Sequence, residues 1–245
     1  MIEARQLTKV YHDRKRGQIQ AVNGVDFRCE PGRTFGLLGV NGAGKTTCLR
    51  LLATILRPTA GSAAVNGFDI LTQGEKVRAS IGFLSTATAL YGRLTAFEMV
   101  EYFGRLHGME DHALRARIDD LFQTLGMNEF RDRRCDKLST GMKQKTSIAR
   151  TLVHDPPVMI FDEPTLGLDV LTARTVLGFI RECGQQGKTV IFSTHVMSEA
   201  ERLCDSIAII HGGRILAEGD LAQLRARTGV ESLEDIFIRV VEEHA

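Results

Sequence analysis

The chain has 245 residues, of which 43% are hydrophobic and 25% charged, and its net charge is +1 at neutral pH. This composition is that of an ordinary globular protein, long enough for one large α/β domain or for a domain with an inserted lobe, and it excludes extensive disorder. Acidic and basic residues are interleaved, so no overall field favours nucleic acid, and we expect no nucleic-acid partner.

The five cysteines lack the CxxC spacing of zinc sites, and an odd number argues against a complete disulfide framework. A reducing cytosol is the simplest setting for such a chain. The N-terminus lacks the pattern of a signal peptide, and no apolar run is long enough to cross a bilayer. If the protein works at a membrane, we expect another chain to supply the membrane span.

The N-terminal part predicts antiparallel strands. Apolar and polar residues alternate over 2–11 and 20–29, as they do in half-buried strands, and the polar stretch 12–17 is the expected turn. Further on, Asn66-Gly67 between two apolar runs is a strong hairpin signal. We therefore expect an antiparallel β subdomain at this end of the chain.

Between these hairpins, residues 36–47 read Gly-Leu-Leu-Gly-Val-Asn-Gly-Ala-Gly-Lys-Thr-Thr, which fits the phosphate-binding pattern of strand, glycine loop and helix. Glycines let backbone N–H groups surround a polyphosphate, Lys45 adds positive charge, and the hydroxyl of Thr46 suits magnesium. The glycine spacing does not match a dinucleotide fingerprint. The expected phosphate-binding residues are Gly39, Asn41, Gly42, Ala43, Gly44, Lys45, Thr46 and Thr47. The pattern after Thr47 predicts a helix over 48–56.

The period of the apolar residues changes to helical from Thr95 onward, which predicts an inserted α-helical subdomain over roughly 86–150. Thr95 and Glu98 form a capping-box pattern at the start of its first helix. A second helix carries an apolar face. That face comprises Leu114, Ile118, Leu121, Phe122 and Leu125.

Apolar runs without alternation at 81–84, 158–161, 190–193 and 207–210 predict parallel strands covered on both faces, separated by helical segments. A last helix follows Ser232. It either packs on this chain's own core, which we favour, or pairs with a partner. Its apolar stripe comprises Leu233, Ile236, Phe237, Val240 and Val241.

Two acids, Asp162 and Glu163, end the apolar run that begins at Val158. The carboxyl ends of parallel strands line the ligand crevice, so we expect Asp162 beside the magnesium ion bound by Thr46. Glu163, one step further, is the expected general base that orients a water toward the γ-phosphate. Such a pair elsewhere only caps a helix, but the preceding phosphate loop favours the catalytic interpretation.

Residues 138–145 read Leu-Ser-Thr-Gly-Met-Lys-Gln-Lys, a small polar loop that opens a helix. It is either a second phosphate site at a helix N-terminus or a plain N-cap by Ser139. The octet resembles the signature motif of ATP-binding cassette (ABC) ATPases, usually Leu-Ser-Gly-Gly-Gln, and departs from it at Thr140 and Met142. The β-carbon of Thr140 tightens the approach to a phosphate but adds no charge, so we expect the motif to keep its function. The expected nucleotide contacts are Ser139, Thr140 and Gly141.

The resemblance covers almost the whole chain and implies further site residues. Tyr11 matches the residue that stacks on adenine, although a lone tyrosine also packs at strand edges. Asp169 belongs to a loop resembling the one that communicates across the dimer, and His195 matches the histidine that contacts the γ-phosphate. The family places a glutamine or an acid at the position of Thr86, which we expect to act as a weaker metal ligand with slower turnover.

The resemblance implies a P-loop NTPase (RecA-like) α/β fold: a parallel core, the N-terminal antiparallel β subdomain and the inserted α-helical subdomain. It implies one ATP-binding domain over 1–245, with the helical subdomain at about 86–150 and a C-terminal helix at about 232–243. ATP and Mg²⁺ are the implied cofactors. Two copies are expected to sandwich ATP head to tail between phosphate loop and signature.

Within the family the chain looks most like exporter subunits of the sodium-efflux type, on residues 89–95, the signature variant and 149–156. A separate multi-span permease is the implied partner, at the cytoplasmic face of the cell membrane. Leu90, Tyr91 and Phe97 are either its contacts or core residues. The alternatives are drug, lipid or polysaccharide cargo, a soluble cassette of the iron–sulfur assembly type, and a module that binds ATP without hydrolysing it.

Overall fold

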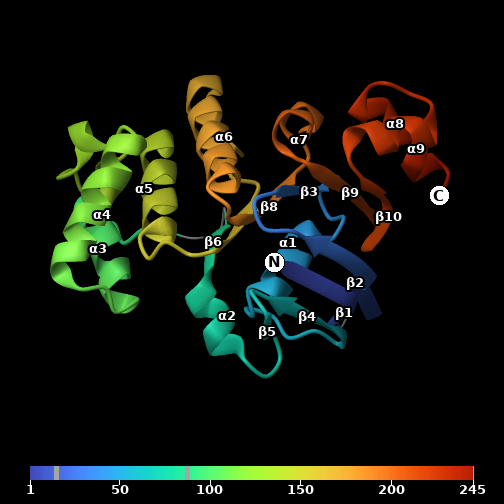
Figure 1. The fold of residues 1–245 in the computed structure, drawn as a ribbon, viewed down its shortest axis with the longest axis horizontal. Coiled ribbons are helices and arrows are strands. Elements are labelled where there is room, and N and C mark those ends of the chain that lie inside the picture. Colours follow the sequence, from blue (N-terminus) through green and yellow to red (C-terminus); the bar gives the residue numbers. More distant parts are fainter. Residues whose placement is uncertain (14–16, 86–88, 245) are drawn as a thin grey trace.

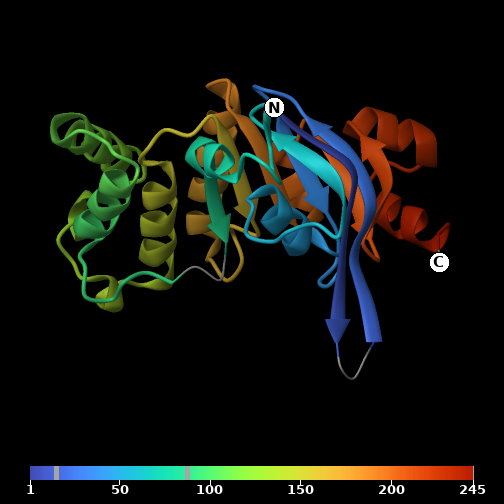
Figure 2. The same cartoon turned by 90° about the horizontal axis from the view of Figure 1, so that it is seen from below.

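The computed structural model describes residues 1–13, 17–85 and 89–244. Its N-terminal sheet contains, in spatial order, β2 (Gly17–Cys29), β1 (Ile2–Asp13), β4 (Ala60–Val65) and β5 (Phe68–Asp69), all antiparallel. β1 and β2 form a long hairpin that projects from the body of the molecule (Figure 2). The predicted antiparallel subdomain is confirmed.

Both predicted N-terminal hairpins form, but the first has longer strands than expected. Asp13 pairs with Gly17, so the strands extend into the stretch assigned to the turn, and residues 14–16 lie outside the described residues. In the β4–β5 hairpin, Asn66 and Gly67 have φ angles of 52° and 79°. Positive φ at both central residues is the geometry that twists a two-residue turn to match its strands.

The second sheet has the order β10-β9-β3-β8-β7-β6. β6, β7, β8, β3 and β9 are parallel, and β10 is antiparallel to β9. Every residue of β3, β7 and β8 is buried, which is why the middle of each strand lacks polar residues. The bounds are β3 (Thr34–Leu38), β6 (Ile81–Ser85), β7 (Val158–Asp162), β8 (Thr189–Thr194), β9 (Ser206–His211) and β10 (Arg214–Gly219).

The helices next to the sheets are α1 (Lys45–Leu52), α2 (Gly74–Ser80), α6 (Val170–Gln185) and α7 (Met197–Leu203). The sequence prediction placed the first helix over 48–56 and was wrong about both ends. The helix begins in the phosphate loop itself, and it ends before Thr54, whose φ of 58° is incompatible with a continuing helix. The short helix α2 was not predicted.

Three helices form a lobe to one side of the sheets (Figure 1): α3 (Ala96–Leu106), α4 (Asp111–Thr124) and α5 (Thr140–Leu152). Short 3-10 turns at Asn128–Phe130 and Cys135–Lys137 connect α4 to α5. The predicted capping box is present, with the Thr95 side chain accepting from Glu98 N. The lobe has no separate core, because its buried side chains form one cluster with Leu84, Met159 and Phe161 of the sheet.

The three side chains considered as membrane-subunit contacts differ in exposure. Tyr91 is 56% exposed and stacks edge-on against Tyr102. Phe97 instead packs on the lobe, with its ring against Phe122 and under the guanidinium of Arg131. Leu90 is half-buried against the same core cluster. The contact interpretation therefore suits Tyr91 and does not suit Phe97.

The chain ends in α8 (Leu221–Thr228) and α9 (Leu233–Glu242). Ser232 caps α9 by accepting from Asp235 N. The buried side chains of α9 cluster with Leu38 and Ile209 of the sheet, so the helix packs on its own core as we favoured. α8 was not predicted, because its apolar face is short.

All five cysteines are free thiols. Burial raises the pKa of Cys48 and of Cys183 to about 12, so both thiols stay protonated at neutral pH. Among the described residues no helix combines the length and the apolar character that a bilayer span requires.

The docking of α9 gives a stability prediction. Ile236 is fully buried, whereas Ile238 on the same helix is 47% exposed. Ile236→Ala should lower the free energy of unfolding by about 2–5 kcal/mol, through lost burial and the cavity left behind. Ile238→Ala should change it by less than about 0.5 kcal/mol. Urea unfolding followed by circular dichroism measures both values, and equal losses would contradict the docking.

Candidate functional site

The phosphate loop connects β3 to α1, and two of its glycines are required by neighbouring chain segments. A β-carbon on Gly39 would lie 2.4 Å from the carbonyl oxygen of Ile210, and one on Gly44 would lie 2.3 Å from that of Ala21. Gly44 also has a φ of 109°. These glycines let the loop pack against its own protein, in addition to any ligand.

The remaining loop residues lie where a ligand can reach them. Asn41 and Gly42 are exposed, and Thr47 is half-buried in the first turn of α1. Ala43 is buried, and its N–H donates to the carbonyl of Val40 at 3.1 Å. The loop is therefore closed on itself by the main chain before any ligand binds.

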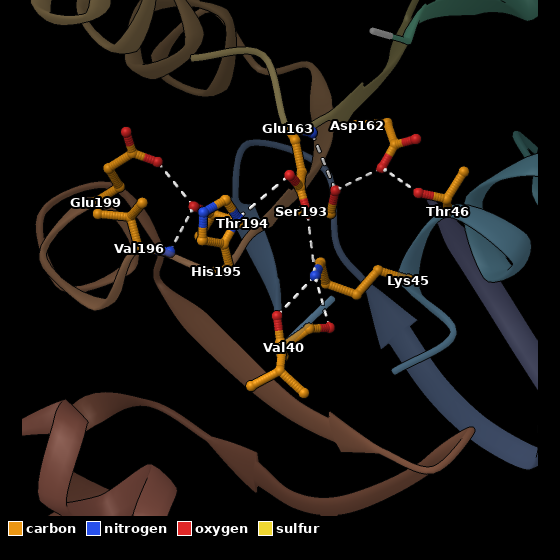
Figure 3. A network of polar contacts seen from close by, with 11 residues as sticks. Val40, Lys45, Thr46, Asp162, Glu163, Ser193, Thr194, His195, Val196 and Glu199 are labelled. Carbon is orange, nitrogen blue, oxygen red and sulfur yellow. Dashed lines mark hydrogen bonds and ion pairs between the residues drawn. The ribbon is translucent and has the colours of Figure 1, made fainter. Parts of the chain in front are cut away.

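Lys45 lies beneath the loop and is 3% exposed. Its ammonium donates to the carbonyl oxygens of Gly39 at 2.6 Å and Val40 at 3.2 Å, and lies 3.1 Å from Glu163 Oε1 (Figure 3). A buried ammonium group is costly unless it is hydrogen-bonded and paired, and these three oxygens meet that need. The carboxylate of Glu163 is thus an anionic partner of the loop lysine.

Asp162 is the last residue of β7 and is almost fully buried. It accepts two hydrogen bonds at Oδ1, from Thr46 Oγ1 at 3.1 Å and from Ser193 Oγ at 2.8 Å. Burial raises the pKa of Asp162, and these hydrogen bonds oppose that rise. The predicted pair, Thr46 and Asp162, is therefore in direct contact, whereas Thr86, the third predicted metal ligand, lies outside the described residues.

Glu163 follows in the left-handed region, with a φ of 48°. This conformation costs a non-glycine residue about 1–2 kcal/mol and persists where surrounding groups fix it. Here the Glu163 N–H donates to both the carbonyl and the hydroxyl of Ser193, each at 3.1 Å. Ser193 therefore accepts from the main-chain N–H of Glu163 and donates its hydroxyl to the carboxylate of Asp162.

The Glu163 carboxylate lies between two basic side chains. Oε1 approaches Lys45, and Oε2 lies 3.2 Å from Nδ1 of His195 (Figure 3). That approach lacks hydrogen-bond geometry, and His195 Nδ1 makes no hydrogen bond to any residue in the described part of the chain. The two predicted catalytic residues are therefore adjacent, and the imidazole keeps a nitrogen without a hydrogen-bond partner.

The signature residues lie at the start of α5. Ser139 is its N-cap and accepts from Met142 N at 3.3 Å, so the N-cap role of Ser139 is confirmed. Thr140 is exposed and Gly141 half-buried in the first turn. The free N–H groups of that turn give the positive end of a helix dipole. A second role in phosphate binding is compatible with this geometry and stays a prediction.

Asp169 lies beside the signature, and both border a hollow of about 580 Å³. Its carboxylate accepts from Leu171 N and Thr172 N at 3.0 Å each and from Thr172 Oγ1 at 2.7 Å. The hydrogen bonds from Thr172 lower the pKa of Asp169, which stays ionised. None of the residues around this hollow belongs to the phosphate loop.

The two predicted nucleotide-contacting regions therefore stay apart in one chain. α1, which follows the phosphate loop, and α5, which follows the signature, are well separated in both views (Figures 1 and 2). Tyr11 lies on the long hairpin, 37% exposed, with the Lys9 ammonium 5.4 Å from its ring centroid. Its ring is accessible to a ligand and is not buried by packing.

Sequence reasoning missed Ser193, Thr194 and Glu199. A weak signal was present, because Ser193 and Thr194 are polar residues that directly follow the apolar run 190–192 in a fully buried strand. Polar groups in such a position need hydrogen-bond partners. Which partners they have depends on the neighbouring strand and helix, and the sequence does not show them.

The fold and the site together define a P-loop nucleotide-binding cassette: a glycine loop and lysine, a strand ending in two acids, and a helical lobe that carries a second polar loop. Comparison with known proteins agrees. Residues 22–166 match the family model described as ABC transporter. The chain belongs to this family, as the ATP-binding, ATP-hydrolysing subunit of a transporter.

The chain is similar to several transporter subunits over nearly its full length. It is 42% identical to the ABC transporter ATP-binding protein NatA of Bacillus subtilis, covering 97% of both chains. It is 34% identical to the probable multidrug ABC transporter ATP-binding protein YbhF of Escherichia coli, covering 99% of this chain and 42% of YbhF. These similarities support a transporter-associated ATPase without defining its cargo.

Solved structures agree with the fold. An ATP-binding subunit of an ABC transporter superposes with a TM-score of 0.89 at 28% identity, over 98% of this chain and 99% of that one. A dimeric cassette in a post-hydrolysis state, bound to ADP and Pi, superposes with a TM-score of 0.83 at 26% identity, over 90% of this chain and 99% of that one. Cassettes of this fold thus bind nucleotide and form dimers.

The double role of Ser193 gives a prediction on turnover. Ser193→Ala removes one donor to Asp162 and one acceptor for the Glu163 N–H, which loosens both carboxylates. A small displacement of catalytic groups costs up to about 100-fold in rate, so we expect kcat for ATP hydrolysis to fall by about 10- to 100-fold. Steady-state phosphate release measures this. Ser198→Ala, at an exposed position of α7, is the control and should retain kcat.

Proposed function

We propose that residues 1–245 form a single ATP-binding domain, with the helical subdomain over about 86–150 and the C-terminal helix over about 232–243, that powers an exporter through a separate membrane subunit. The observation that carries the catalytic part is the position of Glu163. Its carboxylate lies beside Lys45 and His195, one residue after Asp162. This arrangement suits a general base next to the site of a terminal phosphate.

Each polar residue of the site has a separate role in hydrolysis. Lys45 and the loop N–H groups bind and orient the phosphates. Glu163 accepts the proton of the attacking water, because its carboxylate lies between Lys45 and His195, the groups that bind the terminal phosphate. His195 offers its Nδ1, which makes no hydrogen bond to the described residues, to that phosphate. The contact between Lys45 and Glu163 is replaced by phosphate when nucleotide binds.

The hydroxyl of Thr46 and the carboxylate of Asp162 fit Mg²⁺. Both are oxygen donors, and they are already in contact at 3.1 Å. Mg²⁺ prefers oxygen ligands and keeps several of its waters, so two protein ligands are sufficient beside phosphate oxygens. The ion, when bound, neutralises charge on the phosphates, and Thr86 is our proposed additional ligand.

Two copies complete the site in this proposal. Ser139, Thr140, Gly141 and Asp169 are far from Lys45 in one chain, and a second copy placed head to tail supplies them across the nucleotide. The γ-phosphate then has contacts in the closed pair that it lacks in the open one. Such differential affinity is what allows ATP to drive closure and hydrolysis to drive opening. Tyr11 stacks on the adenine.

The role of Glu163 gives a testable prediction. Glu163→Gln keeps the size of the side chain but removes the base, so phosphate release should fall by about 10²- to 10⁴-fold. ATP binding should persist and should trap the closed dimer, detected by size-exclusion chromatography and small-angle scattering. Glu234→Gln, at an exposed position of α9, should behave as the unmodified protein.

Two results would contradict this prediction separately. Hydrolysis at the unmodified rate would reject Glu163 as the base. A Glu163→Gln protein that stays monomeric when saturated with ATP, alone and with its membrane partner, would reject the sandwich.

We propose a multi-span permease as the partner, bound through the helical lobe at the cytoplasmic face of the membrane. Tyr91, Tyr102 and Leu106 are 56%, 43% and 64% exposed and lie on or next to α3. Beside them, a hollow of about 340 Å³ is lined by residues of the lobe and the sheet, including Phe103 and Arg150. Large apolar side chains gathered at a surface indicate a protein contact.

We propose sodium as the cargo, because the sequence resembles exporters of that type and the chain is 42% identical to NatA. The prediction concerns inverted membrane vesicles that contain this chain and the membrane subunit that co-purifies with it. They should accumulate radioactive sodium when ATP is present, and vesicles with Glu163→Gln should not.

The other outcomes of this experiment are informative. ATP-dependent uptake of a drug, lipid or polysaccharide without sodium would replace the cargo and keep the exporter. Recovery of only soluble partners on affinity purification from membranes would contradict the exporter and favour a cassette of the iron–sulfur assembly type.

A further inference from the structure

The main chain around His195 is fixed by one buried hydroxyl group. Thr194 precedes His195 and is 2% exposed. Its Oγ1 accepts a hydrogen bond from Val196 N at 3.0 Å and donates to Glu199 Oε2 at 2.8 Å (Figure 3). The residues on both sides of His195 are therefore joined through this hydroxyl and connected to α7.

Glu199 fastens the same loop a second time, through its main chain. Its N–H donates to the carbonyl of Val196 at 3.2 Å. Glu199 thus holds Thr194 with its side chain and Val196 with its backbone, and His195 lies between them. We call these four residues the His195 clamp.

The clamp is also attached to the phosphate loop. The carbonyl of Thr194 accepts from Gly39 N at 3.3 Å. Gly39 packs closely against Ile210, since an added β-carbon would lie 2.4 Å from the Ile210 carbonyl oxygen. The main chain at His195 is therefore connected to the phosphate loop through the hydrogen bond from Gly39 N to the Thr194 carbonyl.

The orientation of the His195 imidazole depends on these main-chain hydrogen bonds, because the ring itself is weakly held. The side chain is 36% exposed, and Nδ1 lies 3.2 Å from the Glu163 carboxylate, which approaches without hydrogen-bond geometry. Because His195 Nδ1 makes no hydrogen bond within the described part of the chain, the direction of the ring depends mainly on its backbone. Small errors in backbone direction then move Nδ1 away from a phosphate.

We propose that Glu199 is a positioning residue for ATP hydrolysis, acting through the hydroxyl of Thr194 to hold His195 against the terminal phosphate. Glu199 itself does not touch the nucleotide. This inference rests on the proposed role of His195. The competing explanation is that Glu199 only stabilises the N-terminus of α7, whose N-cap, Val196, has no side-chain cap.

Kinetics of paired variants separate the two explanations. Thr194→Val keeps the shape of the side chain and removes its hydroxyl, whereas Thr194→Ser keeps the hydroxyl. Glu199→Ala removes the acceptor, and Glu201→Ala is the matched control on the same helix, because the Glu201 carboxylate accepts from Leu233 N of α9 instead. Thermal unfolding of each variant accompanies the rates.

Thr194→Val and Glu199→Ala should each lower kcat by about 10- to 100-fold, with KM for ATP changed by less than about twofold. Thr194→Ser and Glu201→Ala should retain kcat. In a His195→Ala background, Thr194→Val should lower the residual rate by less than about twofold, because the group that it positions is already absent.

Three results would overturn the proposal. These are an unchanged kcat in Thr194→Val, an equal loss for Glu201→Ala and Glu199→Ala, and a loss for Thr194→Val of the same size with and without His195. If His195→Ala itself turns over at the unmodified rate, the proposed role of His195 fails instead, which distinguishes the two hypotheses.

Discussion

A buried carboxylate, that of Asp162, is the group around which the nucleotide end of the sheet is arranged. A charge in the protein interior is stable only if hydrogen bonds replace its lost hydration. Thr46 and Ser193 supply them from two other elements, α1 and β8. The requirement also fixes strand register, because Asp162 pairs with Ser193 across the sheet, and a shift by one residue would turn Ser193 to the opposite face.

Once this register is set, the next residues follow. Glu163 leaves the strand in a left-handed conformation that Ser193 holds, and its carboxylate meets Lys45 and His195. The strain is local and is offset by hydrogen bonds from a neighbouring strand. Thus β3 with the phosphate loop that follows it, β7 and β8 bring these side chains together at one edge of the sheet, although they are far apart in the sequence.

The helical lobe is joined to this edge by packing. Its buried side chains share a cluster with Met159 and Phe161, which precede Asp162 on β7. Close-packed interiors transmit displacement rather than absorb it. The proposed partner, bound at the exposed Tyr91 and Tyr102, would therefore be mechanically connected to the strand that carries Asp162.

The sequence by itself determined most of the elements and the class of site, because hydrophobic periodicity, the glycine loop and the Asp-Glu pair are local patterns. It also predicted that Thr46 and Asp162 would meet, since parallel strands end at a common edge. It misplaced the ends of the first helix and did not predict α2 or α8. Only the tertiary structure decided that Ser193 bridges both acids and that Glu199 reaches Thr194, because hydrogen-bond partners of buried polar groups depend on register and packing between elements.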